Sequence, residues 1–257
     1  MKEKMIVIGG GVGPMAGVGL HKNIIENTQT DGTDQTHLRV AHFSASDCIS
    51  DRTKFLLGEV MDSPAEGMAK VMQMAEAAAQ KAGQEAVAGV PCNTFHAPKI
   101  WDRFIEILQE GGSNLKMLHM LNETADYIAT MLPNAKNIGL MSTTGTRSVK
   151  VYNQILEPRG LNIIEVPEEI QPELHDSIYN PDWGIKAIAP VTEKAQSNFK
   201  KYADILQKQG AEAIILGCTE IPLALTEPEH NGIPLVDPMV ALARRLVQEA
   251  NPEKLKK

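Results

Sequence analysis

The chain has 257 residues, 43% of them hydrophobic and 22% charged, which suits one large domain or two of ordinary size. This composition excludes a disordered, collagenous or disulfide-stapled chain. A net charge of −7, with only five Phe, four Tyr and two Trp, argues against a nucleic-acid-binding protein. We see no secretory signal and no membrane span near the N-terminus, and three cysteines without framework spacing are typical of a reducing compartment. We therefore expect a cytoplasmic protein with no membrane partner.

Short apolar runs alternate with helix-like stretches along the chain. The expected strands are Met5–Gly9, Arg39–Ser44, Glu85–Val90, Leu115–Met120, Asn137–Ser142, Leu161–Val166, Glu212–Leu216 and Ile233–Val236. The expected helices are Ala65–Lys81, Ile100–Glu110, Glu123–Leu132, Val149–Glu157, Ala187–Gln209 (divided, or opened anew, by Pro190) and Met239–Glu249. This alternation predicts an α/β fold built from βαβ units around parallel sheets.

A glycine-rich loop, Gly9–Ala16, follows the first expected strand. Its Gly11-x-Gly13-x-x-Ala16 spacing satisfies a loose dinucleotide fingerprint, for which Asp47 would be the acidic partner after the second strand. An NAD(P)-dependent oxidoreductase is therefore one interpretation. A tight loop that offers backbone N–H groups to a small anion fits the residues equally well.

Two further residues lie after the second expected strand. Arg52 is in a loop where one guanidinium can hold a carboxylate with two hydrogen bonds, although a solvated surface arginine is an equal alternative. Cys48 has no counterpart elsewhere in the chain, and we interpret it as structural.

One internal repeat relates the two halves of the chain. The segment from Lys81 to Thr94 aligns, with a one-residue gap, with the segment from Lys208 to Glu220. Each copy reads as a helix end, a glycine, a buried strand and then a cysteine, Cys92 or Cys218. In open α/β sheets, ligands bind just beyond the carboxyl ends of strands. Two similar halves that face each other would bring both cysteines to opposite walls of one cleft.

The cysteine contexts predict acid/base chemistry. At the start of a helix, backbone N–H groups and the helix dipole favour a thiolate, so we expect each cysteine to be activated there. Asn93, Thr94 and Thr219 add donors that suit an α-carboxylate. Either cysteine alone reads more readily as a small buried hydrophobic residue, but the duplication favours function.

Two other groups near these segments have plainer interpretations. The hydroxyls of Ser142–Thr146 suit a carboxylate or cap the next helix. His96 can share a helical face with Cys92, but we expect a partly exposed helix residue. The seven histidines show no metal-ligand spacing, so we expect no metal.

Together these segments resemble the aspartate/glutamate racemase superfamily, most closely the aspartate racemases. The segments that carry the resemblance are Gly9-Gly10-Gly11-Val12-Gly13-Pro14, Asp34-Gln35-Thr36-His37, Asp51-Arg52-Thr53, Pro91-Cys92-Asn93-Thr94-Phe95-His96, Ser142-Thr143-Thr144-Gly145-Thr146, Gly217-Cys218-Thr219-Glu220 and Asp237-Pro238.

The resemblance implies two pseudo-symmetric α/β domains with parallel sheets, the active site in the interdomain cleft, a homodimer and no cofactor. We expect the first domain over residues 1–115 plus 222–257 and the second over 116–221, with the C-terminal helix packing on the first. The resemblance also implies two catalytic residues, Cys92 and Cys218. The substrate-binding residues that it implies are Arg52, Asn93, Thr94, Thr143, Thr219 and Glu220.

The activity expected from this resemblance is cofactor-independent racemisation of a small-molecule amino acid. One cysteine, as thiolate, removes the Cα proton, and the other, as thiol, delivers a proton to the opposite face. Glu220 stands where glutamate racemases usually have a histidine, which points away from them. The lysine that aspartate racemases commonly place before an Ile-Tyr pair is absent before Ile178-Tyr179, so the substrate is aspartate or a related amino acid. A glutamate or hydantoin racemase, the oxidoreductase and a non-catalytic binding protein are the alternatives.

Overall fold

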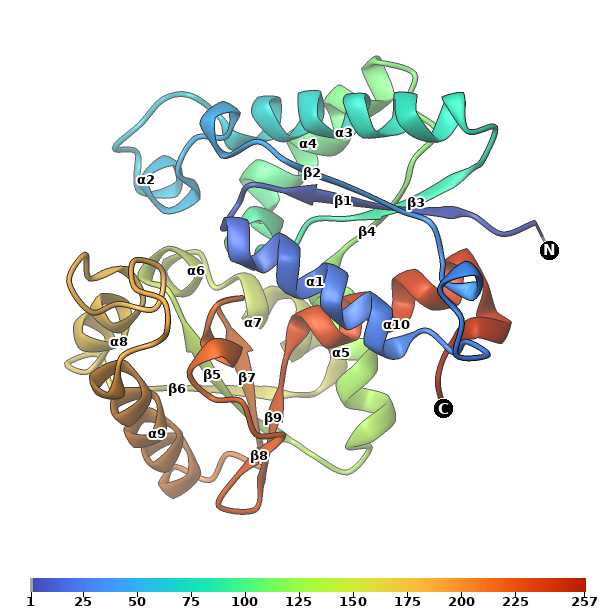
Figure 1. Cartoon of the computed structure of the whole chain (residues 1–257). Helices are drawn as coiled ribbons and strands as arrows, with labels where there is room; N and C mark the ends of the chain where they lie inside the picture. Colours follow the sequence, from blue (N-terminus) through green and yellow to red (C-terminus); the bar gives the residue numbers. More distant parts are fainter. Residues whose placement is uncertain (1) are drawn as a thin grey trace. The chain divides into compact units, whose positions relative to one another are not determined.

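The chain divides into two compact units, each built around its own sheet. The computed structural model describes residues 2–257 (Figure 1). The first unit runs to Glu123 and resumes over Met239–Lys257, and the second is Thr124–Pro238. Residues 116–123 therefore belong to the compact first unit and 222–238 to the second, whereas the domain limits expected from the sequence lie at 115/116 and 221/222. The shift at the second limit follows from strand pairing, because Ile233–Val236 pairs with a strand of the second unit.

The first unit contains a four-stranded parallel sheet. Its strands are β1 (Met5–Gly10), β2 (Val40–Ser44), β3 (Ala86–Gly89) and β4 (Lys116–Leu118), in the order β2-β1-β3-β4. The helices are α1 (Pro14–Asn27), α2 (Arg52–Leu57), α3 (Pro64–Lys81), α4 (Pro98–Glu110) and α10 (Pro238–Ala250). Helices α3 and α4 cover one face of the sheet, and α1 and α10 cover the other (Figure 1).

This sheet lies in the interior of the unit, with apolar side chains on both of its faces. All six residues of β1 are buried, as is typical of a parallel strand covered on both faces. The C-terminal helix α10 packs on the sheet, as expected from the sequence, because Leu242 lies directly against Gly89. A Cβ at position 89 would be 3.0 Å from a methyl carbon of Leu242, so the glycine makes room for the helix.

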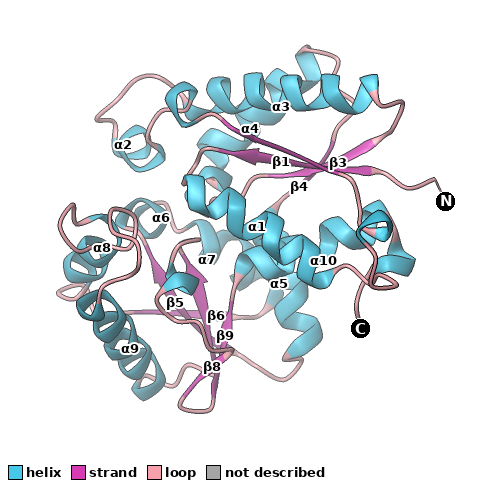
Figure 2. Cartoon of the chain, viewed as in Figure 1, coloured by secondary structure: helices cyan, strands magenta, loops and turns pink. Residues whose placement is uncertain are grey.

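The second unit contains a five-stranded sheet. Its strands are β5 (Asn137–Ser142), β6 (Asn162–Glu165), β7 (Ala213–Gly217), β8 (Glu229–His230) and β9 (Ile233–Val236), in the order β6-β5-β7-β9-β8. The pairings are parallel except for the short edge hairpin between β8 and β9 (Figure 2). The helices are α5 (Met120–Met131), which begins at the end of the first unit, α6 (Thr144–Ser148), α7 (Val151–Leu156), α8 (Gln171–Tyr179) and α9 (Glu193–Lys208).

The expected parallel α/β architecture is confirmed, two local expectations are wrong, and one helix lies where the sequence analysis predicts no element. The helix expected over Val149–Glu157 is divided into α6 and α7, because Lys150 adopts a left-handed conformation between them. Helix α8 was not expected at all. Pro190 lies before α9 and not inside a helix, because Thr192 caps the helix by accepting a hydrogen bond from the Ala195 N–H.

Among residues 2–257, no helix combines the length and the apolar character that crossing a bilayer requires.

Candidate active site

The glycine loop after β1 is shaped by close backbone contact. Gly11 and Gly13 have φ angles of 92° and 111°, a region that favours glycine. A Cβ at position 11 would lie 2.8 Å from the backbone of Ala45, so the loop packs against the chain that follows β2. Pro14 then opens α1, as expected for a proline in a first helical turn.

Cys92 lies in a tight loop three residues after β3. Its N–H donates to the Val90 carbonyl at 2.9 Å, and the residue is 7% exposed. Asn93 and Thr94 follow it and are also buried. The structure thus places three of the expected site residues together at the carboxyl end of β3, where a parallel sheet presents its ligands.

A single 3₁₀ turn follows this loop, and the expected exposure of His96 is wrong. The turn is Thr94–His96, and His96 is 1% exposed. Its Nδ1 lies 2.8 Å from the Cys92 carbonyl oxygen, and its Nε2 accepts from the Met120 N–H at 3.2 Å. Both ring nitrogens are satisfied by backbone groups, which is how the imidazole can be buried.

Arg52 begins a helix and does not lie in a loop. Asp51 caps α2 by accepting a hydrogen bond from the Lys54 N–H at 2.8 Å. The Arg52 guanidinium is half-buried and donates to the Ser50 carbonyl at 3.4 Å. The next residue, Thr53, is buried, and its hydroxyl has no hydrogen-bond partner among the described residues.

Cys48 is exposed, so its thiol has no structural role in the core. Its backbone, however, is in close contact with α3. A Cβ at position 67 would lie 1.9 Å from the Cys48 carbonyl oxygen, so Gly67 lets α3 cross this segment.

In the second unit, the loop after β5 is held by hydrogen bonds within the unit. The Thr143 hydroxyl accepts from the Thr146 N–H at 3.2 Å and so caps α6. Gln171 donates to the Ser142 carbonyl at 3.0 Å, and Thr144 N–H donates to His175 Nδ1. The structure therefore gives Thr143 a capping role, and its role in substrate binding stays a prediction.

Cys218 follows β7 directly and belongs to a buried polar cluster with Glu220 and Lys186. The Cys218 thiol donates to Glu220 Oε2 at 3.1 Å, and the Thr219 hydroxyl donates to the same oxygen at 3.1 Å. The other carboxylate oxygen of Glu220 pairs with Lys186 Nζ at 2.5 Å. Three of the expected site residues thus lie together, and they are joined by Lys186, which no motif in the sequence marks.

The charges in this cluster act against a free thiolate. Burial and the Glu220 carboxylate raise the pKa of Cys218 well above its usual range, and Lys186 opposes this. Burial would also raise the pKa of Glu220, but the Lys186 ammonium and the hydrogen bonds hold it below its usual value. The expected activation of Cys218 by a following helix is therefore wrong, because only the 3₁₀ turn Ile221–Leu223 follows.

Lys186 comes from the irregular stretch between α8 and α9. Burial would lower its pKa, but the negative charges that Cys218 and Glu220 can carry hold it above its usual range. Its Nζ lies 5.6 Å from the centre of the Tyr179 ring. Lys186 thus lies near Tyr179 although it follows Tyr179 by seven residues in the chain.

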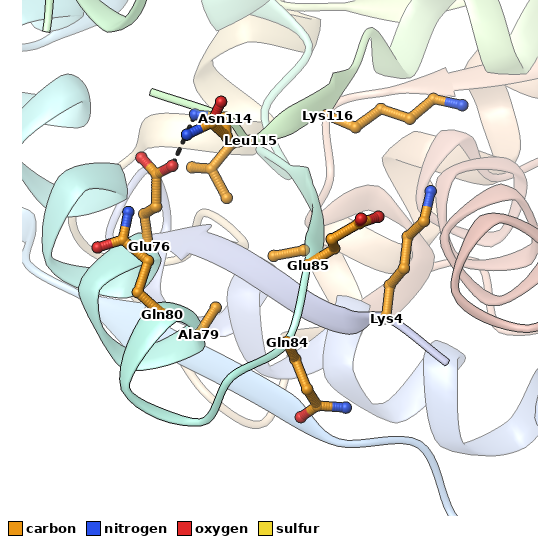
Figure 3. Close-up of a pocket in the computed structure, with 10 residues that line it drawn as sticks. Lys4, Glu76, Ala79, Gln80, Gln84, Glu85, Asn114, Leu115 and Lys116 are labelled. Carbon is orange, nitrogen blue, oxygen red and sulfur yellow. Dashed lines mark hydrogen bonds between the residues drawn. The ribbon is translucent and has the colours of Figure 1, made fainter. Parts of the chain in front are cut away.

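A separate pocket of about 480 Å³ lies at the amino ends of the strands of the first sheet, whereas Cys92 lies beyond the carboxyl end of β3 (Figure 3). It is lined at the amino ends of the strands by Lys4, Glu76, Ala79, Gln80, Gln84, Glu85, Ala86, Asn114, Leu115 and Lys116. Two of the charged side chains in the lining have partners: Glu76 accepts a hydrogen bond from the Asn114 N–H, and Lys116 pairs with Glu249. None of the expected site residues lines this pocket.

The Asp/Glu/hydantoin racemase family model matches residues 10–246. The chain belongs to this family. The racemase class expected from the sequence is thereby confirmed at the level of the family, and the oxidoreductase interpretation is not favoured.

Solved structures of racemases have the same two-sheet fold. The chain is 25% identical to the aspartate racemase of Picrophilus torridus, with a TM-score of 0.78 over 100% of this chain and 97% of that one. It is 23% identical to an aspartate racemase homologue of Pyrococcus horikoshii, with a TM-score of 0.68 over 96% and 99% of the two chains. The glutamate racemase of Francisella tularensis, solved with D-glutamate, is 13% identical with a TM-score of 0.60 over 100% and 84%, and shows the fold alone.

One curated relative shares a shorter segment with this racemase-family chain. An uncharacterised protein of Pectobacterium carotovorum is 32% identical over 102 residues, which make up 38% of this chain and 64% of that protein. Its length is thus matched over less than two thirds.

Proposed function

We propose that this protein is a cofactor-independent amino-acid racemase that interconverts L- and D-aspartate, or a related amino acid, by proton transfer at two cysteines. The observation that carries the proposal is the buried Cys218–Glu220–Lys186 cluster. A thiol that donates to a carboxylate held by an ammonium is arranged to give up and take back a proton. The family, the duplicated cysteine and the likeness to the Picrophilus aspartate racemase support the same reaction.

In one direction of the reaction, Cys218 acts as the acid. Its raised pKa keeps a proton on sulfur at neutral pH, ready to be delivered to the Cα carbanion. Cys92, as thiolate, removes the Cα proton from the other face. Backbone N–H groups and the hydroxyls of Thr94 and Thr219 stabilise the charge that develops on the α-carboxylate.

In the opposite direction, Cys218 has to become the base. Glu220 Oε2 is within hydrogen-bond distance of the thiol and can take its proton, which leaves a thiolate beside the Lys186 ammonium. The total charge of the three groups is unchanged by this transfer. The cluster therefore lets one cysteine serve as acid or base without an uncompensated buried charge.

Lys186 also supports an acidic substrate. The residues expected to bind the substrate include one other cation, Arg52, in the first unit. The Lys186 ammonium shares its charge with Glu220, and its other N–H groups can donate to a distal carboxylate of the substrate. In this proposal, Asn93, Thr94, Thr143 and Thr219 hold the α-carboxylate, and Arg52 and Lys186 hold the side-chain carboxylate.

The deciding experiment is proton NMR of the purified protein in D2O with L-aspartate and no added cofactor, beside L-glutamate and several neutral amino acids. We expect the Cα–H signal of aspartate to disappear, with D-aspartate confirmed on a chiral column. Exchange on another amino acid alone would keep the chemistry and move the substrate. Absence of exchange on every amino acid, with reduced thiols and folded protein, would contradict the proposal.

The assembly that we propose is a cytoplasmic homodimer. Three large apolar side chains on α1, those of Met15, Val18 and Ile25, are about half exposed, and such clusters mark interaction surfaces. Sedimentation equilibrium is expected to give twice the mass of one chain. A charged residue at Val18 is expected to shift the equilibrium to the monomer, and a monomeric wild-type protein would contradict this part of the proposal.

A further inference from the structure

His96 is a fully buried histidine whose ring connects two backbone segments of the first unit. It lies four residues after Cys92, at the end of the 3₁₀ turn, and meets the start of α5 at Met120. The ring stacks on Trp101 with a centroid separation of 4.6 Å, and the His119 ring meets it edge-on at 4.7 Å. The position of the ring is therefore fixed by aromatic contacts and by a hydrogen bond at each nitrogen.

The hydrogen bonds determine which nitrogen carries the proton. The Met120 N–H is a donor, so the Nε2 atom 3.2 Å away must accept. The proton of a neutral ring is then on Nδ1, which donates to the Cys92 carbonyl at 2.8 Å. Burial and the neighbouring His119 lower the pKa of His96 well below its usual value, consistent with a ring that stays neutral.

This bond completes the backbone hydrogen bonds of Cys92. The Cys92 N–H is already bonded to the Val90 carbonyl, and the Cys92 C=O receives the His96 Nδ1–H. With both of its backbone groups held, the direction of its Cα–Cβ bond is fixed. The direction in which the Cys92 side chain leaves the backbone is then set by backbone hydrogen bonds, whereas the Cys218 thiol is held by the Glu220 side chain.

We propose that His96 is a positioning residue for Cys92, acting as a neutral Nδ1–H tautomer that orients the cysteine peptide. This inference rests on the proposed two-cysteine racemisation. His96 is not a catalytic residue in it, because the ring contacts the backbone of Cys92 and not the reacting atoms. Its effect is on the direction of the Cys92 thiol toward Cα.

Two substitutions separate the bond to Cys92 from the bond to Met120. In His96→Asn, the side-chain amide N–H replaces Nδ1–H and can still donate to the Cys92 carbonyl. In His96→Gln, the longer side chain places its amide oxygen near the Nε2 position, where it accepts from Met120 but leaves Cys92 unbonded. Both variants lose the stacking on Trp101, so each serves as the stability control for the other.

We expect His96→Asn to keep most of its racemase activity and His96→Gln to lose about 100-fold in kcat, with a smaller change in KM, because small misplacements of a reacting group are that costly. With Cα-deuterated substrate, His96→Gln is expected to show a larger isotope effect on kcat/KM in the direction in which Cys92 removes the proton, and a smaller one in reverse. Equal activities of the two variants, or equal isotope effects in both directions, would overturn the proposal.

Two readouts do not require activity. In 15N-histidine NMR, the His96 signal of the wild-type protein is identified as the one that is missing from the spectrum of His96→Asn. It is expected to show the Nδ1–H tautomer and not to titrate between about pH 5 and pH 8. The rate at which iodoacetamide alkylates Cys92, mapped by mass spectrometry, is expected to differ several-fold between His96→Gln and the wild-type protein. The rate at Cys92 in His96→Asn, and the rate at Cys48 in every sample, are expected to stay the same. An imidazolium, an Nε2–H tautomer or an unchanged Cys92 rate would refute the role of His96, whereas a wild-type protein inactive on every amino acid refutes the proposed function separately.

Discussion

Glu220 Oε2 lies 3.1 Å from the Cys218 sulfur and accepts a hydrogen bond from its thiol, and both residues are buried. A carboxylate so close to a thiol opposes ionisation of that thiol. The Lys186 ammonium, which pairs with the other carboxylate oxygen, has the opposite effect and favours the thiolate. The protonation state of Cys218 is therefore set by two neighbours of opposite charge. Replacing Glu220 or Lys186 is therefore expected to change the reactivity of Cys218.

Replacing either of the two cysteines that we propose as acid and base is expected to remove most or all of the racemase activity. Loss of a positioned acid or base typically costs about 100- to 10,000-fold, so Cys92→Ser and Cys218→Ser should each reduce kcat by that range in both directions. The exposed Cys48 offers a matched control, because Cys48→Ser removes a thiol without touching either loop. Chiral chromatography of reaction time courses measures all three. Substantial activity in Cys92→Ser or Cys218→Ser is incompatible with two-base chemistry.

Glu220→Gln is expected to make Cys218 more reactive and the protein less stable. Removing the carboxylate leaves the positive Lys186 beside the thiol, so the pKa of Cys218 falls and alkylation at neutral pH becomes faster. An ammonium left without its buried partner costs about 3 to 5 kcal/mol of unfolding free energy. Urea denaturation and mass-mapped alkylation measure the two effects, and Cys48 is the internal standard. A slower reaction at Cys218 would show that Glu220 does not suppress its ionisation.

The cysteine loops were accessible to sequence reasoning, but their electrostatics were not. Thr219 and Glu220 are adjacent to Cys218 in the chain, so a local motif could place them in the site. Lys186 is 34 residues from Glu220 and comes from an irregular stretch, so only the tertiary fold determines their pairing. The burial of His96 could not be predicted for a similar reason: its Nε2 is satisfied by the Met120 N–H, which lies 24 residues away at the start of α5. The parallel α/β architecture, by contrast, follows from periodic apolar runs that can be read locally.

Lys186→Met tests whether the lysine serves the substrate, the cysteine or both. Without the ammonium, Glu220 is a buried carboxylate beside a thiol, so its pKa rises and Cys218 is harder to ionise. We expect kcat to fall by at least about tenfold for every amino acid that the enzyme accepts. If Lys186 also holds a distal carboxylate, KM rises for aspartate and not for a neutral amino acid. Lys194→Met, at a lysine that packs on the Trp183 ring at the surface, is the matched control. Unchanged kinetics in Lys186→Met would remove the lysine from the site.

Acid is expected to destabilise the first unit before the carboxylates titrate. Burial lowers the pKa of His21 and of His42, and the charge of His21 adds to the effect on His42. A histidine whose folded pKa is lowered contributes stability that is fully present above its unfolded value, about 6.5, and is lost as the pH falls below it. His42 Nε2 is buried without a hydrogen-bond partner among the described residues, and Cβ atoms at positions 10 and 17 would clash with it, so the ring has little room for water. We expect the Tm to fall as the pH is lowered from about 7 to about 5.5, because the unfolded chain takes up protons on these histidines more readily than the folded chain does. His42→Leu should flatten that part of the curve. A Tm that is independent of pH over this range in the wild-type protein would contradict the lowered pKa values.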